Sequence, residues 1–312
     1  MTSQTADPPE PRRQDLLTEG RRFEPCRPVR LRSRDYVASG TMSDSYVHGY
    51  QPRENERLQD QAGTLVDLLH SDTAYAPGST VLEAGCGVGA QTVTLAQCSP
   101  RARFTSIDIS ADSIAEAKRK VDSAGLSNVQ FRQADIFNLP FEAESFDHIF
   151  VCFVLEHLSR PVEALAILNG RLRPGGTMTV IEGDHGSAYF HPDSAPARAA
   201  IQCQVALQRE AGGNALIGRQ LYPLMVEGGL DAVRVSPRMV YVDSSRPDLV
   251  DGFTRKTFTA MIEGIRKAAI AADLIEPGTF DAGVEDLHRT TGADGVFCYT
   301  FFKGVGGKKR RA

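Results

Sequence analysis

The sequence predicts a doubly wound α/β fold built on a mostly parallel sheet of seven strands. Short apolar segments alternate with amphipathic helical segments between residues 80 and 181. A glycine-rich turn connects the first apolar segment to the helix that follows it. The runs 149–153 and 178–181 are apolar without alternation, as expected of strands buried on both faces. These three observations together favour a parallel sheet covered by helices.

The predicted elements follow a regular order up to residue 181. A helix over 54–70 has apolar residues at helical spacing, and Pro77 with Gly78 ends the connection behind it. The segments predicted after this helix are strand 80–83, helix 91–96, strand 103–107, helix 111–124, strand 129–133, strand 146–153, helix 161–172 and strand 177–181.

Beyond Glu182 the pattern changes because two insertions interrupt it. A helix over 195–211 occupies the place of a tight crossover, and a largely helical stretch over 248–289 is too long for a hairpin connection. We expect both to form helical lids over one end of the sheet. The segments predicted to complete the sheet are helix 216–228, strand 232–242 and strand 296–302.

The domain organisation follows from these elements. We expect a disordered extension over 1–42, because it has many prolines and few apolar residues. The pattern predicts one domain over 43–306, with helical insertions at 184–213 and 247–290, and a basic, solvated tail over 307–312. The amino-terminal segment has no apolar stretch typical of a leader, and its arginines are balanced by acidic residues. Whether Met1 or Met42 is the natural start is left open.

Composition limits the classes of partner. The chain has 35 basic and 39 acidic residues and a net charge of −4, without a basic stripe interleaved with aromatic residues, so we expect no nucleic-acid partner. The longest apolar run, 149–155, is far shorter than the roughly 20 residues of a membrane span, so no transmembrane segment is expected. The six cysteines include no Cys-x-x-Cys pair, and we expect them reduced, without metal, in a cytoplasmic protein. The sequence leaves open whether the chain forms a homo-oligomer.

The glycine-rich turn is the first candidate binding feature. Glu83 ends a predicted strand, and Gly85, Gly87 and Gly89 follow at alternate positions before a helix. Glycine at 85 and 87 allows a sharp turn and a close approach to a ligand. A tight strand-to-helix turn without any ligand is the alternative, because one glycine-rich loop is weak evidence.

Two aspartates strengthen the ligand interpretation. Asp108, followed by Ile109, closes the next strand at the spacing where nucleotide-binding folds place a ribose-binding carboxylate. Asp135, followed by Ile136, ends the third strand, where a carboxylate can accept a hydrogen bond from an adenine amino group. The carboxyl ends of parallel strands are where open α/β sheets bind ligands. Each aspartate alone is more often a helix cap, so their joint placement is the signal.

The motifs together resemble class I S-adenosylmethionine-dependent methyltransferases, and the branch of ubiquinone/menaquinone and sterol methyltransferases in particular. The resemblance covers about residues 45–240. The segments that carry it are 83–89, Asp108, 135–136, 139–141, 145–147, 155–158 and 172–176. The indole-terpenoid C-methyltransferases of bacterial natural-product pathways are one branch to which the chain is similar. Family membership implies a Rossmann-like fold with S-adenosylmethionine as cofactor.

The resemblance also implies roles for individual residues. Glu83 would neighbour the methionine amino group, and Gly85 and Gly87 would face the cofactor. Asp108 with Ile109 would hold the ribose, and Asp135 with Ile136 would read adenine. An amino-terminal segment with Tyr46 and Tyr50 would fold over the cofactor. Tyr46, Tyr50 and Phe153 could offer π faces to the sulfonium, although aromatic residues at such places more often serve packing.

Two histidines are the candidate catalytic residues. Methyl transfer needs no covalent intermediate, but a proton must leave the acceptor, and histidine accepts protons near neutral pH. His157 follows the fourth strand, and its alternative role is a helix-start residue. His185 follows the fifth strand with Asp184 beside it to orient the ring, and a turn-forming pair is the alternative.

The expected function is methylation of a small, fairly hydrophobic metabolite, with C-methylation in secondary metabolism as one form of it. Apolar residues of the insertions favour such an acceptor, although they could instead pack the added helices onto the core. These residues are Phe190, Phe253, Phe258, Met261 and Ile262. A non-catalytic protein that binds S-adenosylmethionine is the first rival. An NAD(P)-dependent oxidoreductase is the second, since Gly85, Gly87 and Ala90 satisfy a permissive dinucleotide fingerprint, but it leaves Glu83 and Asp135 unexplained.

Overall fold

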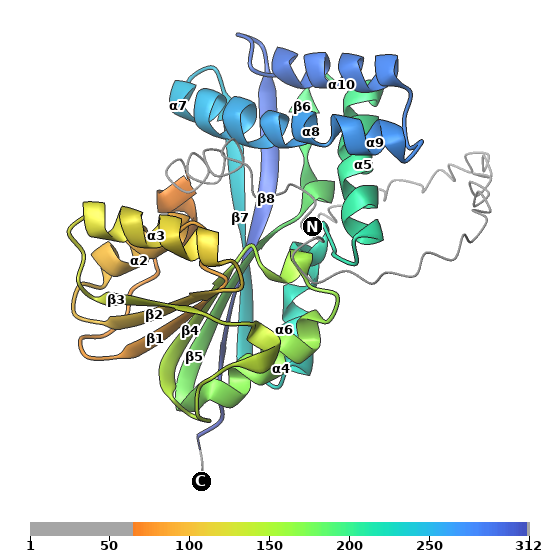
Figure 1. Cartoon of the computed structure of the whole chain (residues 1–312). Helices are drawn as coiled ribbons and strands as arrows, with labels where there is room; N and C mark the ends of the chain where they lie inside the picture. The colour runs from red at the N-terminus through yellow and green to blue at the C-terminus, as the bar shows by residue number, and fades with distance from the viewer. Residues whose placement is uncertain (1–64, 311–312) are drawn as a thin grey trace, which may run out of the picture. The chain divides into compact units, whose positions relative to one another are not determined.

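The computed structural model describes residues 65–310, which contain an eight-stranded mixed sheet with helices on both faces (Figure 1). The order across the sheet is β3-β2-β1-β4-β5-β8, and β6 and β7 both pair with β8. The strands are β1 (Thr80–Ala84), β2 (Arg103–Asp108), β3 (Val129–Gln133), β4 (Phe146–Cys152), β5 (Leu172–Gly183), β6 (Tyr189–His191), β7 (Asp231–Asp243) and β8 (Val296–Gly307).

The first five strands are parallel, which confirms the predicted doubly wound sheet. β1 pairs with β2 on one side and β4 on the other, so the strand order reverses beside β1. A reversal of this kind separates the loops at the carboxyl ends of the strands and leaves room for a ligand. β5 pairs with β8 in the antiparallel direction, from Thr177 opposite Gly307 to Gly183 opposite Phe301.

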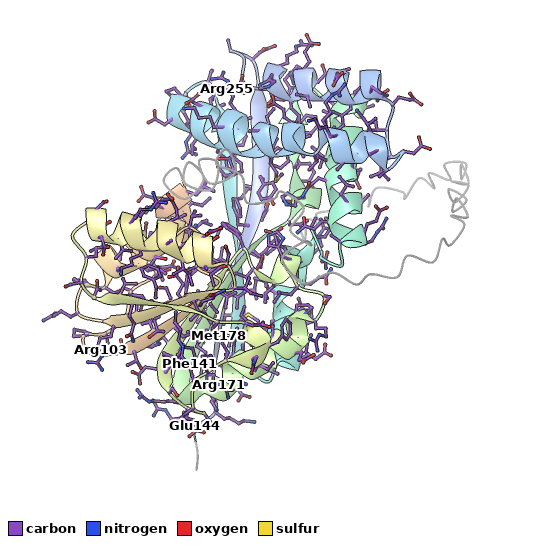
Figure 2. The ribbon with its side chains drawn as sticks, in the orientation of Figure 1. Arg103, Phe141, Glu144, Arg171, Met178 and Arg255 are labelled. Carbon is purple, nitrogen blue, oxygen red and sulfur yellow. The ribbon has the colours of Figure 1, made fainter. Side chains whose placement is uncertain are left out.

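Helices cover the two faces of the parallel part with separate apolar clusters, since alternate residues of each strand point to opposite faces. On one face, Val81 and Phe150 pack against residues 65–70 and α2. On the other face, Leu82 and Met178 pack against α4 and α6. Figure 2 shows Met178 within the fold and Arg103 at its surface. The helices of this part are α2 (Ala90–Cys98), α3 (Ala111–Ser123), α4 (Pro161–Arg171) and α6 (Leu221–Glu227).

The predicted insertions form a group of helices beyond β6 and the first half of β8 (Figure 1). Helix α10 packs against α5, and both contribute to the apolar cluster that also holds Phe297, Tyr299 and Phe301 of β8. The elements of this cap are α5 (Ala195–Glu210), α7 (Pro247–Leu249), the π-helix η6 (Val250–Thr259), α8 (Ala260–Gly264), α9 (Arg266–Ala271) and α10 (Pro277–Arg289).

Three differences from the expected pattern involve pairing over long sequence distances. β6 is an additional strand, because residues 189–191 pair with the start of β8. β5 begins at Leu172, five residues earlier than expected, and the backbone N–H of Gly175 donates to the carbonyl of Lys308 at 2.9 Å. Lys308, expected in a solvated tail, also donates its Nζ to the carbonyl of Leu172 at 2.8 Å. Its backbone and side chain therefore fix the end of β8 to β5.

Residues 1–64 and 311–312 lie outside the described residues. They include the extension expected over 1–42, and Tyr46 and Tyr50, which were expected to fold over the cofactor. Within residues 65–310, no helix is long and apolar enough to cross a membrane.

Candidate active site

The glycine-rich turn after β1 has a left-handed backbone, which glycine adopts without strain. Gly85, Gly87 and Gly89 all have positive φ, at 78°, 51° and 76°. An added Cβ at Gly85 would lie 2.4 Å from a Val154 methyl group, whereas at Gly87 nothing lies within 4 Å. Glycine at 85 thus permits close packing against the loop after β4, and glycine at 87 leaves an open approach to the backbone.

Asp108, at the end of β2, connects this turn to the next helix. One carboxylate oxygen accepts the backbone N–H of Gly87 at 2.8 Å, and the other accepts that of Ser110 at 2.9 Å. Burial raises the pKa of Asp108, and these backbone donors oppose the rise. Each oxygen keeps further acceptor capacity, so the carboxylate can hold the turn and a pair of ligand hydroxyls together.

Glu83, at the end of β1, is a buried carboxyl with 2% exposure. Its Oε2 accepts hydrogen bonds from Ser106 Oγ at 2.6 Å and Thr92 Oγ1 at 2.8 Å. Burial raises the pKa of Glu83 to about 7, although both hydroxyl donors act to lower it. A cationic ligand group beside this carboxyl would favour its ionised form.

The remaining candidate cofactor residues lie at the same edge of the sheet. Asp135 caps a short 3₁₀ helix through the backbone N–H of Phe137 at 2.9 Å, so one oxygen already has a structural partner. Ile136 is buried, and Ile109 is exposed with 42% relative accessibility. Phe153 directly follows β4 with a positive φ of 57°, and its ring lies 5.6 Å from that of Phe301. A positive φ is uncommon for phenylalanine and is typical of functional loops.

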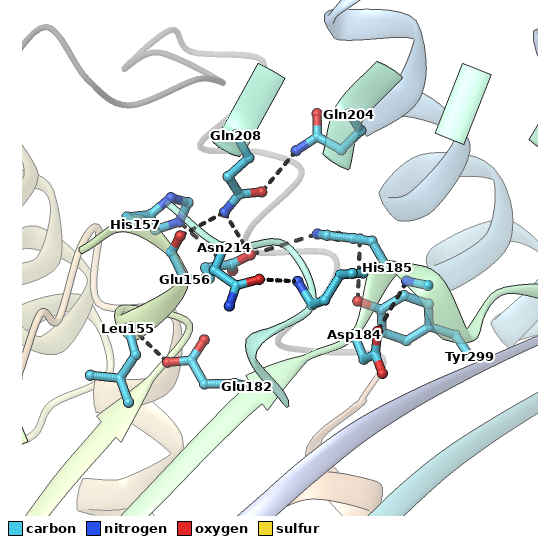
Figure 3. Close-up of polar contacts among 12 residues, drawn as sticks. Leu155, Glu156, His157, Glu182, Asp184, His185, Gln204, Gln208, Asn214 and Tyr299 are labelled. Atoms are coloured by element: carbon cyan, nitrogen blue, oxygen red, sulfur yellow. Dashed lines mark hydrogen bonds and ion pairs between the residues drawn. The ribbon is translucent and has the colours of Figure 1, made fainter. Parts of the chain in front are cut away.

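A buried polar network occupies the ends of β4 and β5 beneath α5 (Figure 3). At its centre is Glu156, in a 3₁₀ turn after β4. Its Oε2 accepts the side-chain amide of Gln208 at 3.1 Å and lies 3.6 Å from His185 Nε2. Its Oε1 lies 3.7 Å from His157 Nε2. The network therefore brings the two predicted histidines to opposite oxygens of one carboxylate.

The second buried carboxyl of the network is Glu182, at the end of β5. Its Oε1 accepts the backbone N–H groups of Val154 and Leu155 at 3.0 and 2.7 Å, and Oε2 has no hydrogen-bond partner among the described residues. Burial and the nearby charge of Glu156 raise the pKa of Glu182 well above its usual range. Burial also acts to raise the pKa of Glu156, but His157, His185 and Gln208 together hold it below its usual range. The surroundings of the two carboxyls therefore act in opposite directions, favouring the ionised form of Glu156 and the protonated form of Glu182.

Of the two roles expected for Asp184, the structure shows the turn-forming one, because Asp184 caps the 3₁₀ turn His185–Ser187. Asp184 forms a bidentate ion pair with Arg219, with its oxygens 2.6 Å from Nε and 2.8 Å from Nη2, and it caps the backbone N–H of Gly186. The partners of Asp184 are thus Arg219 and the turn backbone, not the imidazole of His185. Tyr299 of β8 contacts the imidazole instead, with its hydroxyl 3.2 Å from His185 Nδ1.

Tyr299 and Gln208 belong to no motif of the sequence, and Glu156 belongs to one only as part of the segment 155–158. The one sequence signal for Tyr299 is Gly183, because an added Cβ there would lie 2.5 Å from the Tyr299 hydroxyl. A glycine at a strand end, opposite an aromatic strand, can mark such a close approach.

The apolar residues expected to line an acceptor pocket are tightly packed. Phe253, Phe258 and Ile262 are at most 2% exposed, and Phe190 and Met261 at most 9%. Phe258 lies 4.7 Å from Phe297 and 5.5 Å from Tyr299, ring centre to ring centre. This arrangement favours their role in packing the cap onto β8.

Within residues 65–310, no group of three or more His, Cys, Asp or Glu residues is placed to hold a metal ion.

Part of the chain matches a known family model, and curated proteins are similar to it in sequence. Residues 76–229 match the family model of a methyltransferase domain. The chain is 30% identical over 271 residues to an uncharacterized 37.1 kDa protein of a Streptomyces fradiae transposon. The aligned part covers 85% of this chain and 72% of that protein. It is 32% identical over 112 residues to a demethylmenaquinone methyltransferase of Staphylococcus aureus, covering 36% of this chain and 46% of the relative.

A solved structure agrees at the level of the fold. A Haemonchus contortus phosphoethanolamine N-methyltransferase, crystallised with phosphomonomethylethanolamine and S-adenosylhomocysteine, superimposes with a TM-score of 0.56 at 14% identity. The alignment covers 87% of this chain and 61% of that one. The chain belongs to the family of S-adenosylmethionine-dependent methyltransferases. The open backbone at Gly87 and the acceptor oxygens of Asp108 and Glu83 fit a ligand with a hydroxylated ribose and a cationic amino acid group.

Proposed function

We propose that this methyltransferase acts on a small, largely apolar metabolite, and that C-methylation in secondary metabolism is the form its reaction takes. The observation that carries the proposal is that the glycine-rich turn and the buried His157–Glu156–His185 network follow strands β1, β4 and β5, which are neighbours in the sheet. A group bound over the turn would thus reach the network from the same edge of the sheet.

The cofactor residues are assigned within this proposal. Asp108 would hold the ribose hydroxyls beside Ile109, and Glu83 would pair with the methionine ammonium group. Asp135 and Ile136 would hold the adenine ring, and Phe153 would pack near the sulfonium. When bound, S-adenosylmethionine supplies an electrophilic methyl group.

The chain's own residues would orient the acceptor, exclude water and remove a proton. The aromatic cluster of β8 and the cap covers the network, since His185 lies 6.3 Å from Phe258 and 5.7 Å from Tyr299 between ring centres. Although these rings pack the cap onto β8, they surround the network with apolar groups, and this supports an acceptor that loses little hydration on binding.

The test is mass spectrometry of a metabolite extract incubated with the protein and methyl-labelled S-adenosylmethionine. We expect one or a few apolar metabolites to gain the label, and less label with an Asp108→Ala variant at a cofactor concentration that does not saturate it. Cofactor binding without any labelled product would instead support a non-catalytic binding protein. Label only on phosphorylated or strongly charged compounds would overturn the acceptor class.

A further inference from the structure

The loop after β4, residues 153–157, turns sharply where it leaves the sheet. The backbone N–H of Phe153 donates to the carbonyl of Ile181 at 2.9 Å, which continues the pairing of β4 with β5. Phe153 itself has a positive φ of 57°, which is uncommon for a residue other than glycine. A backbone of this kind persists only where the surrounding structure fixes it. The contacts of the next residues therefore decide how the loop is held.

The next two backbone N–H groups belong to Val154 and Leu155, at the start of the 3₁₀ helix Leu155–His157. The first N–H groups of a helix have no acceptor within the helix, and the side chain of Val154 has no oxygen to cap them. Glu182, at the end of β5, supplies the acceptor. Its Oε1 accepts from Val154 at 3.0 Å and from Leu155 at 2.7 Å. A carboxyl of the neighbouring strand thus takes the place of a local cap.

This carboxyl is in an unfavourable place for a group that contributes to stability alone. Glu182 has 0% exposure, and its Oε2 has no hydrogen-bond partner among the described residues. Burying a polar atom without a partner lowers stability, and an apolar side chain of similar size would avoid that loss. What the carboxyl adds in return is the pair of hydrogen bonds to the loop. Glutamine would keep this acceptor oxygen, whereas leucine would remove it.

The loop held by Glu182 packs against the glycine-rich turn. An added Cβ at Gly85 would lie 2.4 and 3.2 Å from the two methyl groups of Val154, so the Val154 side chain lies directly against the backbone of Gly85. In the sheet, β4 lies between β1 and β5. Glu182 is therefore two strands away from the turn after β1 and is connected to it through Val154.

We propose that Glu182 is a positioning residue of the cofactor site, which holds Val154 against Gly85 and so keeps the glycine-rich turn in the form that binds S-adenosylmethionine. The inference rests on the cofactor placement of the proposed function and is independent of the acceptor. Removing the acceptor oxygen of Glu182 releases the loop after β4, and the turn that packs against it then binds the cofactor more weakly.

The test is isothermal calorimetry of S-adenosylhomocysteine binding to the full chain, with circular dichroism to verify that each variant is folded. Glu182→Leu should weaken binding by about tenfold, the effect of losing one or two buried hydrogen bonds. Glu182→Gln should bind as wild type. Asp147→Leu is the matched control, because Asp147 Oδ2 accepts the backbone N–H and the hydroxyl of Thr80, both at 2.8 Å, between the starts of β4 and β1. It should lower the free energy of unfolding and leave the affinity unchanged.

A double-mutant cycle tests the connection through Val154. In a Val154→Ala background, Glu182→Leu should weaken binding by less than it does in wild type, whereas a merely structural role would give equal reductions. Amide hydrogen exchange of the wild-type protein, followed by nuclear magnetic resonance, is a measurement that needs no variant to fold. The N–H groups of Val154 and Leu155 should exchange slowly without cofactor, as hydrogen-bonded groups do.

Three results would overturn the inference and leave the proposed function in place. They are fast exchange at both N–H groups, wild-type affinity in Glu182→Leu, and equal losses of affinity in Glu182→Leu and Glu182→Gln. Wild-type protein that binds no S-adenosylhomocysteine would overturn the proposed function and the inference together, so the two failures can be told apart.

Discussion

The carboxylate of Asp108 accepts the backbone N–H of Gly87 at 2.8 Å, so the end of β2 fixes the turn after β1. Gly87 has the positive φ of that turn, and Ser110 at the start of α3 donates to the other oxygen of Asp108. One side chain therefore sets the backbone of two loops that would surround the cofactor. A residue proposed to bind ribose has a structural role at the same time.

Replacing Asp108 by alanine should therefore weaken S-adenosylhomocysteine binding by about 1–3 kcal/mol, because ribose hydroxyls and two backbone N–H groups lose an acceptor in a partly buried place. Isothermal calorimetry measures the change. Asp112→Ala, at an exposed position in the first turn of α3, is the control and should bind as wild type. Wild-type affinity in Asp108→Ala would remove Asp108 from the site.

The parallel half of the sheet could be predicted from sequence because its signals are local. Strand 129–133 coincides with β3, and helix 111–124 ends one residue beyond α3. Apolar runs and glycine turns define such elements without knowledge of their partners. β6 could not be predicted, since it pairs with the start of β8 more than a hundred residues later. The early start of β5 could not be predicted either, because Leu172 pairs with Phe146 and Gly175 bonds to Lys308, both distant in the sequence.

The part of the candidate site at the ends of the parallel strands could be predicted, but the part contributed by β8 and the inserted helices could not. Glu83 and Asp108 follow parallel strands, whose carboxyl ends meet at one edge, so their proximity follows from topology. Tyr299 and Gln208 lie in an antiparallel strand and an inserted helix, for which no such rule applies. An orienting role of Asp184 for His185 was expected only because the two residues are adjacent in the sequence. Asp184 pairs instead with Arg219, which adjacency could not indicate.

Glu83 should make the stability of the cofactor-free protein depend on pH. Burial raises its pKa to about 7 from a usual value near 4.5, so the folded state retains a proton that the unfolded state releases. The stabilisation is complete below pH 4.5 and is lost as pH rises through about 7, with an upper value of about 3 kcal/mol. Denaturant unfolding of wild type and Glu83→Gln between pH 5 and 8 measures the difference.

The gap between these two proteins should grow as pH increases, with Glu83→Gln the more stable at pH 8. Glu163→Gln, at an exposed position paired with Arg160, is the control and should follow wild type. A constant gap across the range would show that Glu83 is ionised in the folded state throughout.

Lys303 should be important for holding residues 65–73 against β8. Its buried Nζ donates to the carbonyl of Leu69 at 3.1 Å and to Asp72 Oδ1 and Thr73 Oγ1, both at 2.5 Å. We expect Lys303→Ala to lower the free energy of unfolding by about 1–3 kcal/mol, because several acceptors lose a charged donor. Lys309→Ala is the control: its ion pair with Asp231 is largely exposed and should contribute little. Equal unfolding free energies for the two variants, measured in urea, would contradict this role.

Gly85 should tolerate alanine only if Val154 is shortened. An added Cβ would lie 2.4 Å from Val154 Cγ2 and 3.2 Å from Cγ1, but 3.4 Å from Cβ, which is an ordinary contact. Gly125→Ala gives the cost of a positive φ alone, since Gly125 has a φ of 67° and open space around it, and we expect about 1–2 kcal/mol. Gly85→Ala should lower the free energy of unfolding by more than this and should also weaken S-adenosylhomocysteine binding.

In a Val154→Ala background, Gly85→Ala should lower the free energy of unfolding by no more than Gly125→Ala does. Urea unfolding of the four variants completes the cycle, and an equal cost of Gly85→Ala in both backgrounds would show that the two loops do not meet as the structure describes.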